Sequence, residues 1–178
     1  MILILGKGTL AQTLHDTIPN SIMVGRPEFD FAFQDQCDLL IEKYPNPRCV
    51  INTVGVISDN TWINLVTNFV SPSYITMRYL ENSPCHIINI SSASAWWPSH
   101  PGLDFKRFSY NISKESLSNL GKHLNRIVID DPNKQITTVE PGKFISKMSH
   151  HQGQDIQDIV NCILMSIDNK IHHISLIK

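Results

Sequence analysis

The chain has 178 residues and a formal net charge of -1 at pH 7. That length supports one domain with a substantial core, so we expect residues 1–178 to form a single domain. The near-zero charge excludes the strong electrostatic footprint of proteins that bind nucleic acid or anionic membranes. No apolar run is long enough to span a bilayer, and the opening MILIL lacks the charged region of a signal peptide. We therefore expect a cytoplasmic protein without nucleic-acid or membrane partners.

The residues that most often bind metals are not grouped in the sequence. The four cysteines are scattered without a C-x-x-C pair: Cys37, Cys49, Cys85 and Cys162. Two histidine doublets, at 150–151 and 172–173, have no cysteine or acidic partner at ligand spacing, and adjacent residues of a strand point to opposite faces. We expect reduced, mostly buried thiols and no metal site.

Short apolar runs alternate with helical patterns along the whole chain. The strand candidates are ILIL (2–5), SIMV (21–24), CVINTV (49–54), HIINIS (86–91), QITTV (135–139) and HISLI (173–177). Their almost continuous apolar character is typical of strands that are covered on both faces, as in a parallel sheet.

Helical patterns fill the intervals between these runs. In order they are a helix with Leu10 and Leu14 that stops before Pro19, a second around 38–41 that ends by Pro45, one or two within 60–80, the longest at 109–129, and a last one around 156–164. Pro72 fits early in a helix or at a kink. The interval between the second and third strands is short, with room for one helix and a short strand around 29–31. We therefore predict a doubly wound, mostly parallel α/β domain, Rossmann-like, with three αβα layers, about six to seven strands and a shortened first half.

A glycine motif, Gly6-x-Gly8-x-x-Ala11, follows the first strand and opens a helix. Gly6 permits a tight turn, Gly8 lets the backbone approach a pyrophosphate, and the small Ala11 lets helix and sheet pack closely. The helix N-terminus adds free N–H groups and a favourable dipole for negative charge. We expect a dinucleotide site here that includes Thr9 and Leu10; the alternative is a glycine-rich turn that binds no ligand.

The end of the second strand bears on the choice of cofactor. The chain reads MVGRPEFD, which puts Arg26 where a carboxylate would bind the ribose 2′-hydroxyl of NAD. A guanidinium pairs well with a 2′-phosphate, so we expect NADPH. Glu28 and Asp30 lie close by and keep NAD possible, with Asp30 as a candidate cofactor contact. The alternative for Arg26 is a solvated arginine in a turn.

Further polar motifs follow in order along the chain: NTVG (52–55), NISS (89–92), Tyr110-x-x-x-Lys114 and EPG (140–142). Each lies at the carboxyl end of a predicted strand or at the start of the helix that follows it. Ligands of open α/β sheets bind outside the carboxyl ends of the strands. We therefore expect these motifs to converge on one side of the sheet.

Together, these motifs resemble those of the short-chain dehydrogenase/reductase superfamily over nearly the whole chain. GKGTLA resembles the family's glycine motif, NTVG its N-N-A-G, NISS its serine strand, YNISK its tyrosine-lysine pair and EPG its late P-G. The segment from GRPEFDF to NPRCVINTVG looks like the sugar-nucleotide reductase branch, such as dTDP-4-dehydrorhamnose reductase. The resemblance implies an NAD(P)H-dependent oxidoreductase that transfers hydride between the nicotinamide and a small carbonyl or alcohol substrate.

The resemblance also assigns roles to single residues. Tyr110 would be the general acid/base, Lys114 would bind the nicotinamide ribose and lower the pKa of the tyrosine, and Ser92 would polarise the substrate carbonyl. Asn68 matches the helix asparagine that holds a water in the family's proton relay. The cofactor would also contact residues at the strand ends: Val54, Gly55, Pro141 and Gly142.

The tyrosine-lysine pair makes chemical sense without the resemblance. A free tyrosine titrates at about 10, so acid/base catalysis near neutral pH needs a neighbouring positive charge. Lys114 follows Tyr110 by one helical turn and lies on the same face. By itself, however, Y-x-x-x-K is a short motif, and the alternative is two polar residues that share a helix face.

One segment departs from the family pattern. The stretch after Ser92 is longer than usual, so Ser91 and Ser94 are alternatives for the serine role. Trp96 and Trp97 in this stretch form an apolar wall over the nicotinamide or substrate in one interpretation. In the other they pack under the loop or at a subunit contact.

The segment after Gly142 is short for a substrate-covering lobe. The sequence leaves three options: a small substrate, an open pocket, or a pocket that a partner subunit covers. The resemblance implies a homodimer or homotetramer that pairs through the helices within 60–80 and 109–129. The short lobe also leaves an alternative function, a non-catalytic dinucleotide-binding sensor or scaffold that retains the fold.

Overall fold

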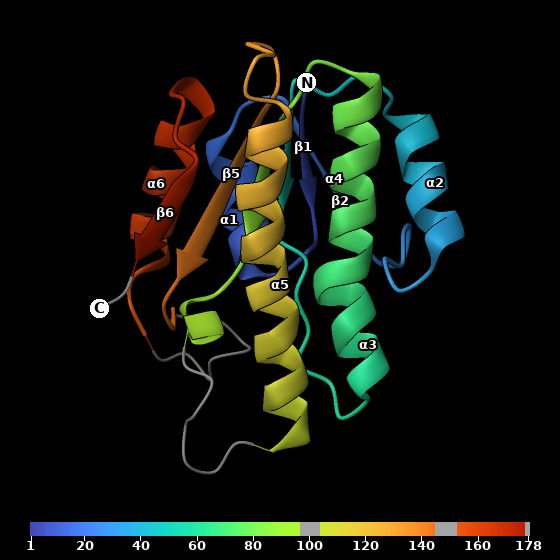
Figure 1. Cartoon of the computed structure of the whole chain (residues 1–178), viewed down its shortest axis with the longest axis vertical. Coiled ribbons are helices and arrows are strands. Elements are labelled where there is room, and N and C mark those ends of the chain that lie inside the picture. Colours follow the sequence, from blue (N-terminus) through green and yellow to red (C-terminus); the bar gives the residue numbers. More distant parts are fainter. Residues whose placement is uncertain (97–103, 145–152, 177–178) are drawn as a thin grey trace.

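A six-stranded sheet forms the centre of the molecule in a computed structural model that describes residues 1–96, 104–144 and 153–176 (Figure 1). The strand order is β2-β1-β3-β4-β5-β6, and every neighbouring pair is parallel. The strands are β1 (Ile2–Leu5), β2 (Ser21–Val24), β3 (Cys49–Asn52), β4 (His86–Ile90), β5 (Gln135–Pro141) and β6 (His173–Leu176).

Helices cover both faces of this sheet. They are α1 (Thr9–Thr17), α2 (Gln34–Lys43), α3 (Thr61–Leu65), α4 (Ser71–Asn82), α5 (Phe105–Ile127) and α6 (Ile156–Asp168). A π-helical turn, η1 (Val66–Val70), joins α3 to α4, and a 3-10 turn, η2 (Ala93–Trp96), follows β4. Helices α1 and α6 pack on one face, and α2, α4 and α5 pack on the other, which gives the predicted three layers.

The central strands are apolar on both sides because both sides face a core. Leu3 belongs to the core under α2 and α4, whereas the next residue, Ile4, belongs to the core under α1 and α6. Val50 and Ile51 of β3 divide in the same way. Consecutive side chains of a strand point to opposite faces, so a strand buried on both faces has no polar alternation. This arrangement explains the continuous apolar runs of the sequence.

The expected short strand at residues 29–31 is wrong. The segment forms a turn, and its two aromatic side chains, Phe29 and Phe31, pack into the core beside β1 and β3. A local hydrogen bond holds the turn, because the carboxylate of Asp30 accepts from the backbone N–H of Ala32 at 3.0 Å. Such local bonding by aspartate competes with strand pairing. The alternation of Phe29 and Phe31 therefore reflects two buried positions in a turn and not a strand.

Helix α5 is fixed against β5 and begins beyond the carboxyl ends of the strands (Figure 1). Its N-cap, Asp104, accepts a hydrogen bond from the backbone of Arg107 at 2.7 Å. Farther along, a Cβ at Gly121 would lie 2.2 Å from the hydroxyl of Thr138, so only glycine permits this close contact with the sheet. The first turns of α5 consequently stand over the carboxyl edge. No helix in the described residues is long and apolar enough to cross a bilayer.

Candidate active site

Lys114 lies at the carboxyl edge of the sheet with its ammonium buried. The side chain extends from α5, and the residue is 3% exposed. Its Nζ donates to the backbone oxygens of Ile90 at 2.9 Å and Val54 at 3.3 Å. A Cβ at Gly55 would lie 3.5 Å from the same Nζ. The ammonium therefore sits between the ends of β3 and β4.

Burial lowers the pKa of Lys114 from 10.5 to about 8. No carboxylate forms an ion pair with it among the residues that the structure describes. The two carbonyl groups are thus the partners that favour the charged form, and desolvation opposes them. Lys114 is therefore still mostly protonated at neutral pH, although its pKa of about 8 lies only slightly above that pH.

Tyr110 lies one turn before Lys114 on α5 and is partly buried. Burial raises the pKa of Tyr110, and a hydrogen bond with Ser92 lowers it in part. Lys114 is not among the groups that shift it, although the sequence led us to expect that the lysine would lower this pKa. Desolvation outweighs the hydrogen bond with Ser92, so the phenol is protonated at neutral pH.

The three candidate serines have different partners. Ser91 donates to the backbone oxygen of Lys114 at 2.7 Å and accepts from Ser118 at 2.8 Å, so it joins sheet to helix. The hydroxyl of Ser92 lies 2.8 Å from that of Ser94 and is a hydrogen-bond partner of the Tyr110 phenol. Ser92 is therefore the serine that meets the tyrosine, with Ser94 beside it.

Asn68 is fully buried in the π-helical turn η1. Its Oδ1 accepts from the backbone N–H of Val56 at 2.8 Å, and its Nδ2 donates to the Val56 oxygen at 2.8 Å. Its amide is thus engaged with the segment that follows Gly55, next to the Lys114 ammonium. Turns of this type recur at functional sites. Asn68 thus holds the backbone at Val56, beside Gly55 and the Lys114 ammonium, in place.

The glycine turn keeps the N-terminus of α1 open. Gly6 has a φ of +113°, and a Cβ there would lie 2.6 Å from the hydroxyl of Thr53, so glycine is required on both counts. Gly8 is the N-cap of α1, and a Cβ there would meet nothing within 4 Å. Thr9 is exposed, whereas the side chain of Leu10 lies in the core and leaves only its backbone N–H for a ligand.

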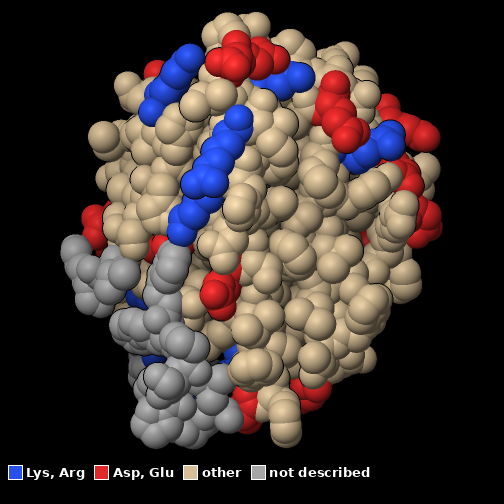
Figure 2. All heavy atoms as spheres, viewed as in Figure 1, with Lys and Arg blue, Asp and Glu red and all other residues tan. Residues whose placement is uncertain are grey.

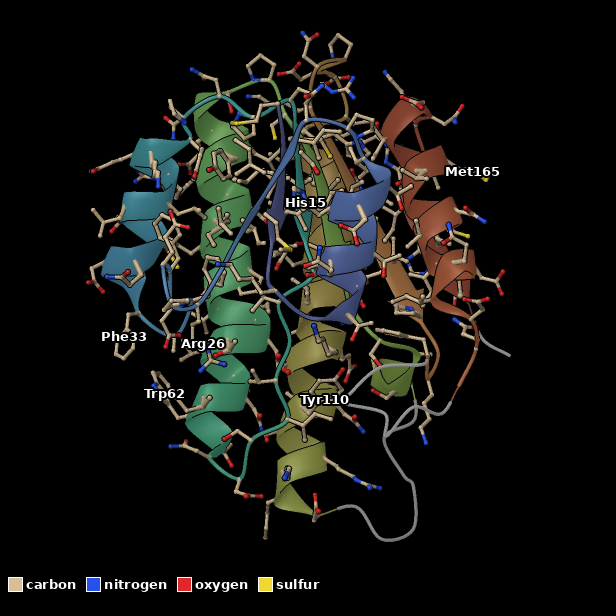
Figure 3. All side chains as sticks on the ribbon, turned by 180° about the vertical axis from the view of Figure 1, so that it is seen from behind. His15, Arg26, Phe33, Trp62, Tyr110 and Met165 are labelled. Atoms are coloured by element: carbon tan, nitrogen blue, oxygen red, sulfur yellow. The ribbon has the colours of Figure 1, made fainter. Side chains whose placement is uncertain are left out.

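The acidic residues after β2 have partners within the structure, whereas Arg26 has no ion pair among the described residues. Glu28 pairs with Lys43 at 2.6 Å, and the Asp30 carboxylate is bonded within its own turn. Arg26 is exposed and has no ion pair in the described part of the chain. In Figure 3, Arg26 and Tyr110 lie toward the same end of the molecule. This arrangement favours Arg26 over its acidic neighbours as a ligand-binding group.

The sequence interpretation missed Lys7, which lies between the two glycines of the turn. Its side chain is exposed and passes close to Gly25, where a Cβ would lie 3.3 Å from the Lys7 Cγ. Lys7 and Arg26 therefore both flank the end of β2. The sequence feature that could have indicated Lys7 as a cofactor contact is its place between Gly6 and Gly8.

The predicted EPG residues close the far side of the edge. Pro141 ends β5, and the backbone N–H of Gly142 donates to the oxygen of Leu176 at 2.9 Å. The preceding residue, Glu140, is fully buried with its carboxylate 3.2 Å from Nε2 of His173. No cluster suited to a metal ion occurs among the described residues. The expected wall of Trp96 and Trp97 concerns side chains outside the described part.

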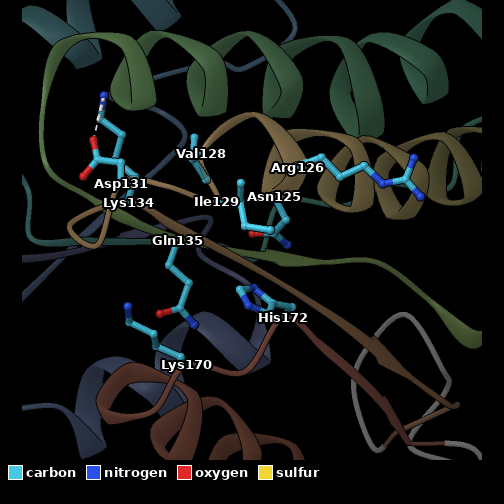
Figure 4. A pocket seen from close by; sticks show the side chains of 9 residues that line it. All are labelled: Asn125, Arg126, Val128, Ile129, Asp131, Lys134, Gln135, Lys170 and His172. Carbon is cyan, nitrogen blue, oxygen red and sulfur yellow. Dashed lines mark ion pairs between the residues drawn. The ribbon is translucent and has the colours of Figure 1, made fainter.

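A shallow pocket lies at the opposite, amino edge of the sheet (Figure 4). Its lining residues come from the end of α5 and from the segments before β5 and β6: Asn125, Arg126, Val128, Ile129, Asp131, Lys134, Gln135, Lys170 and His172. The amide of Asn125 is bonded to the backbone of Ile136, and Asp131 pairs with Lys134 at 3.5 Å. Arg126 points away from the other side chains in Figure 4. The candidate catalytic groups are all at the other edge.

Solved dehydrogenases, two of them short-chain dehydrogenases, have the same fold. One from Sphingobium yanoikuyae in complex with NADPH gives a TM-score of 0.82 at 12% identity, over 98% of this chain and 86% of that chain. One from Burkholderia cenocepacia in complex with NADP gives 0.78 at 13% identity, over 99% and 88%. A 4-hydroxyisoleucine dehydrogenase complexed with NADH and succinate gives 0.77 at 16% identity, over 99% and 97%.

The likeness lies in the structure rather than in the sequence. No protein-family model matches the chain, and no curated protein sequence matches it either. At identities of 12% to 16%, these similarities establish that the chain has the fold of the short-chain dehydrogenases.

Replacing Lys114 with methionine should change how stability depends on pH. The folded-state pKa of about 8 lies below the ordinary 10.5, so between these values the unfolded chain binds more protons and stability rises with pH. From about pH 7.5 to 9.5, this group should add on the order of 1–2 kcal/mol to the free energy of unfolding of the wild type. Urea unfolding at both pH values should show this gain in the wild type and in Lys122→Met, an exposed-lysine control on α5, but not in Lys114→Met. Parallel pH profiles for all three proteins would contradict the buried charge.

Proposed function

We propose that this protein is an NADP(H)-dependent oxidoreductase of the short-chain dehydrogenase/reductase type, acting on a small carbonyl or alcohol substrate. The observation that carries the proposal is the gathering of Tyr110, Ser92 and Lys114 at the carboxyl edge of the sheet, beside an open glycine turn. Solved proteins with this fold hold NADPH, NADP or NADH, which supports a nicotinamide cofactor. The branch resemblance, to dTDP-4-dehydrorhamnose reductase, stays a prediction from the sequence.

In this proposal the three side chains divide the acid/base work. A bound nicotinamide would supply or accept the hydride. Ser92 donates a hydrogen bond to the substrate oxygen and polarises the carbonyl. Tyr110, protonated at neutral pH, gives its proton to that oxygen during reduction. The Lys114 ammonium stabilises the phenolate that remains and binds a ribose hydroxyl.

The cofactor would lie along the carboxyl edge, from the end of β2 to the end of β5. The glycine turn at Gly6 and Gly8 would present the N-terminus of α1 to the pyrophosphate. The floor and the nicotinamide end would come from the strand-end residues Val54, Gly55, Pro141 and Gly142. Asn68 would position the segment after Gly55. This placement of the cofactor is supported by the position of the glycine turn and the strand-end residues, which all lie at the carboxyl edge of one sheet.

A preference for NADPH over NADH follows from the groups at the end of β2. Arg26 and Lys7 are exposed cations at this point. The carboxylates that would bind a 2′-hydroxyl, those of Glu28 and Asp30, already have partners. A guanidinium with free donors binds a phosphate in bidentate fashion.

We also propose that the protein forms a homodimer through the outer faces of α4 and α5; a homotetramer would add a second interface. In Figure 2, few charged side chains lie over α4 and over the first half of α5, whereas Lys and Arg side chains lie over the second half of α5. Large apolar side chains are exposed on them: Val70 (just before α4), Met77, Phe105, Phe108 and Ile112. Contiguous exposed apolar patches mark interaction surfaces, and we propose that these side chains form one.

Changing Tyr110 to phenylalanine should slow turnover by orders of magnitude and leave cofactor binding intact. Loss of a general acid costs about 10²- to 10⁴-fold in rate, so kcat/KM should fall by at least about 100-fold while the NADPH Kd stays within about twofold. The assay follows NADPH oxidation with a panel of small aldehydes, ketones and quinones. Tyr74→Phe, on α4, is the matched control and should retain activity. If wild type and Tyr110→Phe both bind NADPH and neither turns over any substrate, the sensor alternative is favoured instead.

Changing Arg26 to alanine should reduce the preference of the protein for NADPH over NADH. Hydrogen bonds to a charged group contribute about 1.5–3 kcal/mol, so the NADPH Kd should rise by about 10- to 100-fold while the NADH Kd changes little. Fluorescence titration of both cofactors measures the ratio. Arg126→Ala, an exposed arginine at the amino edge, should behave as wild type. An equal loss for both cofactors would contradict 2′-phosphate recognition.

Introducing a charge at Ile112 should dissociate the dimer. Ile112→Asp places a carboxylate in the proposed apolar contact, where burial without a partner is costly. Sedimentation velocity should show a dimer for the wild type and a monomer for the variant. A wild-type protein that is monomeric over the measured concentrations would rule out this interface.

A further inference from the structure

Asn64 is a fully buried asparagine on α3 whose amide is bonded to two separate segments. Its Oδ1 accepts from the backbone N–H of Ser58 at 2.7 Å, and its Nδ2 donates to the Ser58 oxygen at 2.8 Å. The same Nδ2 donates to the hydroxyl of Ser109 at 2.8 Å and reaches the oxygen of Lys106 at 3.3 Å. A primary amide has two N–H groups, and the two short contacts use both of them.

Asn64 and Asn68 together form an amide clamp on the segment after β3. The two residues are one helical turn apart, so they lie on the same face. Asn68 holds Val56 and Asn64 holds Ser58, each by a donor and an acceptor. Alternate residues of an extended chain face the same side. The clamp therefore fixes the backbone that leads away from the Lys114 ammonium.

Asn64 differs from Asn68 because it also reaches α5. Its partners there, Lys106 and Ser109, lie in the first turns of that helix, and Ser109 precedes Tyr110. Asn64 is thus bonded both to the segment that walls the lysine and to the helical turn that carries the tyrosine. An ion pair between Lys106 and Asp59 spans the same junction at 3.0 Å, but its side chains are 36% and 93% exposed. Such exposed pairs contribute little.

We infer that Asn64 is a positioning residue for Tyr110: it sets the phenol in place relative to Ser92 and Lys114. The inference rests on the proposed function. Removing the amide would leave the partly buried N–H of Ser58 without its Asn64 partner and release the first turns of α5 from the clamp. Misplacement of a catalytic group by about 1 Å costs on the order of 100-fold in rate. The residue touches none of the proposed reacting atoms, so its effect would pass through Tyr110.

Two variants and two controls test this role. Asn64→Ala removes the whole connection. Ser109→Ala removes the shorter of the two Asn64 contacts on α5, together with the bond from the Ser109 hydroxyl to the Lys106 oxygen, and leaves Ser58 bonded to Asn64, so it remains informative if the first variant folds poorly. Asn125→Ala breaks a similar amide clamp, on the backbone of Ile136 at the amino edge. Asp59→Ala breaks the exposed ion pair at the same junction.

The readouts separate positioning from stability. A spectrophotometric titration, taken as the difference between each protein and its Tyr110→Phe counterpart, follows the ionisation of Tyr110 alone. Because burial raises this pKa, loosening the turn hydrates the phenol and lowers its pKa toward the ordinary value. Asn64→Ala and Ser109→Ala should show this decrease, together with a kcat reduced by about 10- to 100-fold and an NADPH Kd within about twofold of wild type.

The controls define the outcomes that overturn the inference. Asn125→Ala should lose stability, and neither it nor Asp59→Ala should change the Tyr110 titration or kcat. If Asn64→Ala and Ser109→Ala behave like Asn125→Ala, Asn64 is only a structural residue. Full activity of Tyr110→Phe would overturn the proposed function instead, and the titration would still show whether Asn64 places the phenol.

Discussion

The buried ammonium of Lys114 is the constraint on which the carboxyl edge of the sheet depends. It has two backbone oxygens as partners, at the ends of β3 and β4, and no ion-pair partner in the described residues. Burying a charge without a counter-ion costs free energy, and the lowered pKa reports that cost. Two parallel strands must end side by side for both oxygens to reach one Nζ. A buried charge with a shifted pKa at the carboxyl edge of such a sheet makes Lys114 a candidate functional group.

Tyr110 shows why a motif alone does not fix the chemistry. Its pKa is raised because burial outweighs the hydrogen bond with Ser92, so the phenol carries its proton at neutral pH. Taking up a proton from an alcohol needs the phenolate, which a further positive charge nearby would favour. Under the proposed function, the oxidised nicotinamide brings that charge. The state of the cofactor would then decide whether Tyr110 acts as acid or base.

Patterns in the sequence predicted the sheet, the helices and the edge where the motifs meet, because each follows from local periodicity or from strand ends. The continuous apolar runs predicted a parallel sheet, and Pro72 indeed lies in the first turn of α4. The turn at 29–31 could not be predicted, since buried aromatic residues alternate there as they do in a strand. Nor could the clamp of Asn64, because its partners lie far along the chain and a lone asparagine gives no periodic signal.

The first half of the fold is short, and the candidate site does not depend on the missing part. Between β2 and β3 the chain holds only the turn that contains residues 29–31 and helix α2, and the buried aromatic side chains of that turn cover the core there without a strand. Most of the candidate site comes from the ends of β1, β3, β4 and β5 and from α5, which all lie outside that interval. Arg26 is the exception, because it lies just after β2. Shortening the first half therefore removes cover at one edge of the sheet and no candidate catalytic group. The geometry around the Lys114 ammonium is independent of that loss, because both of its carbonyl partners belong to neighbouring central strands or their immediate ends.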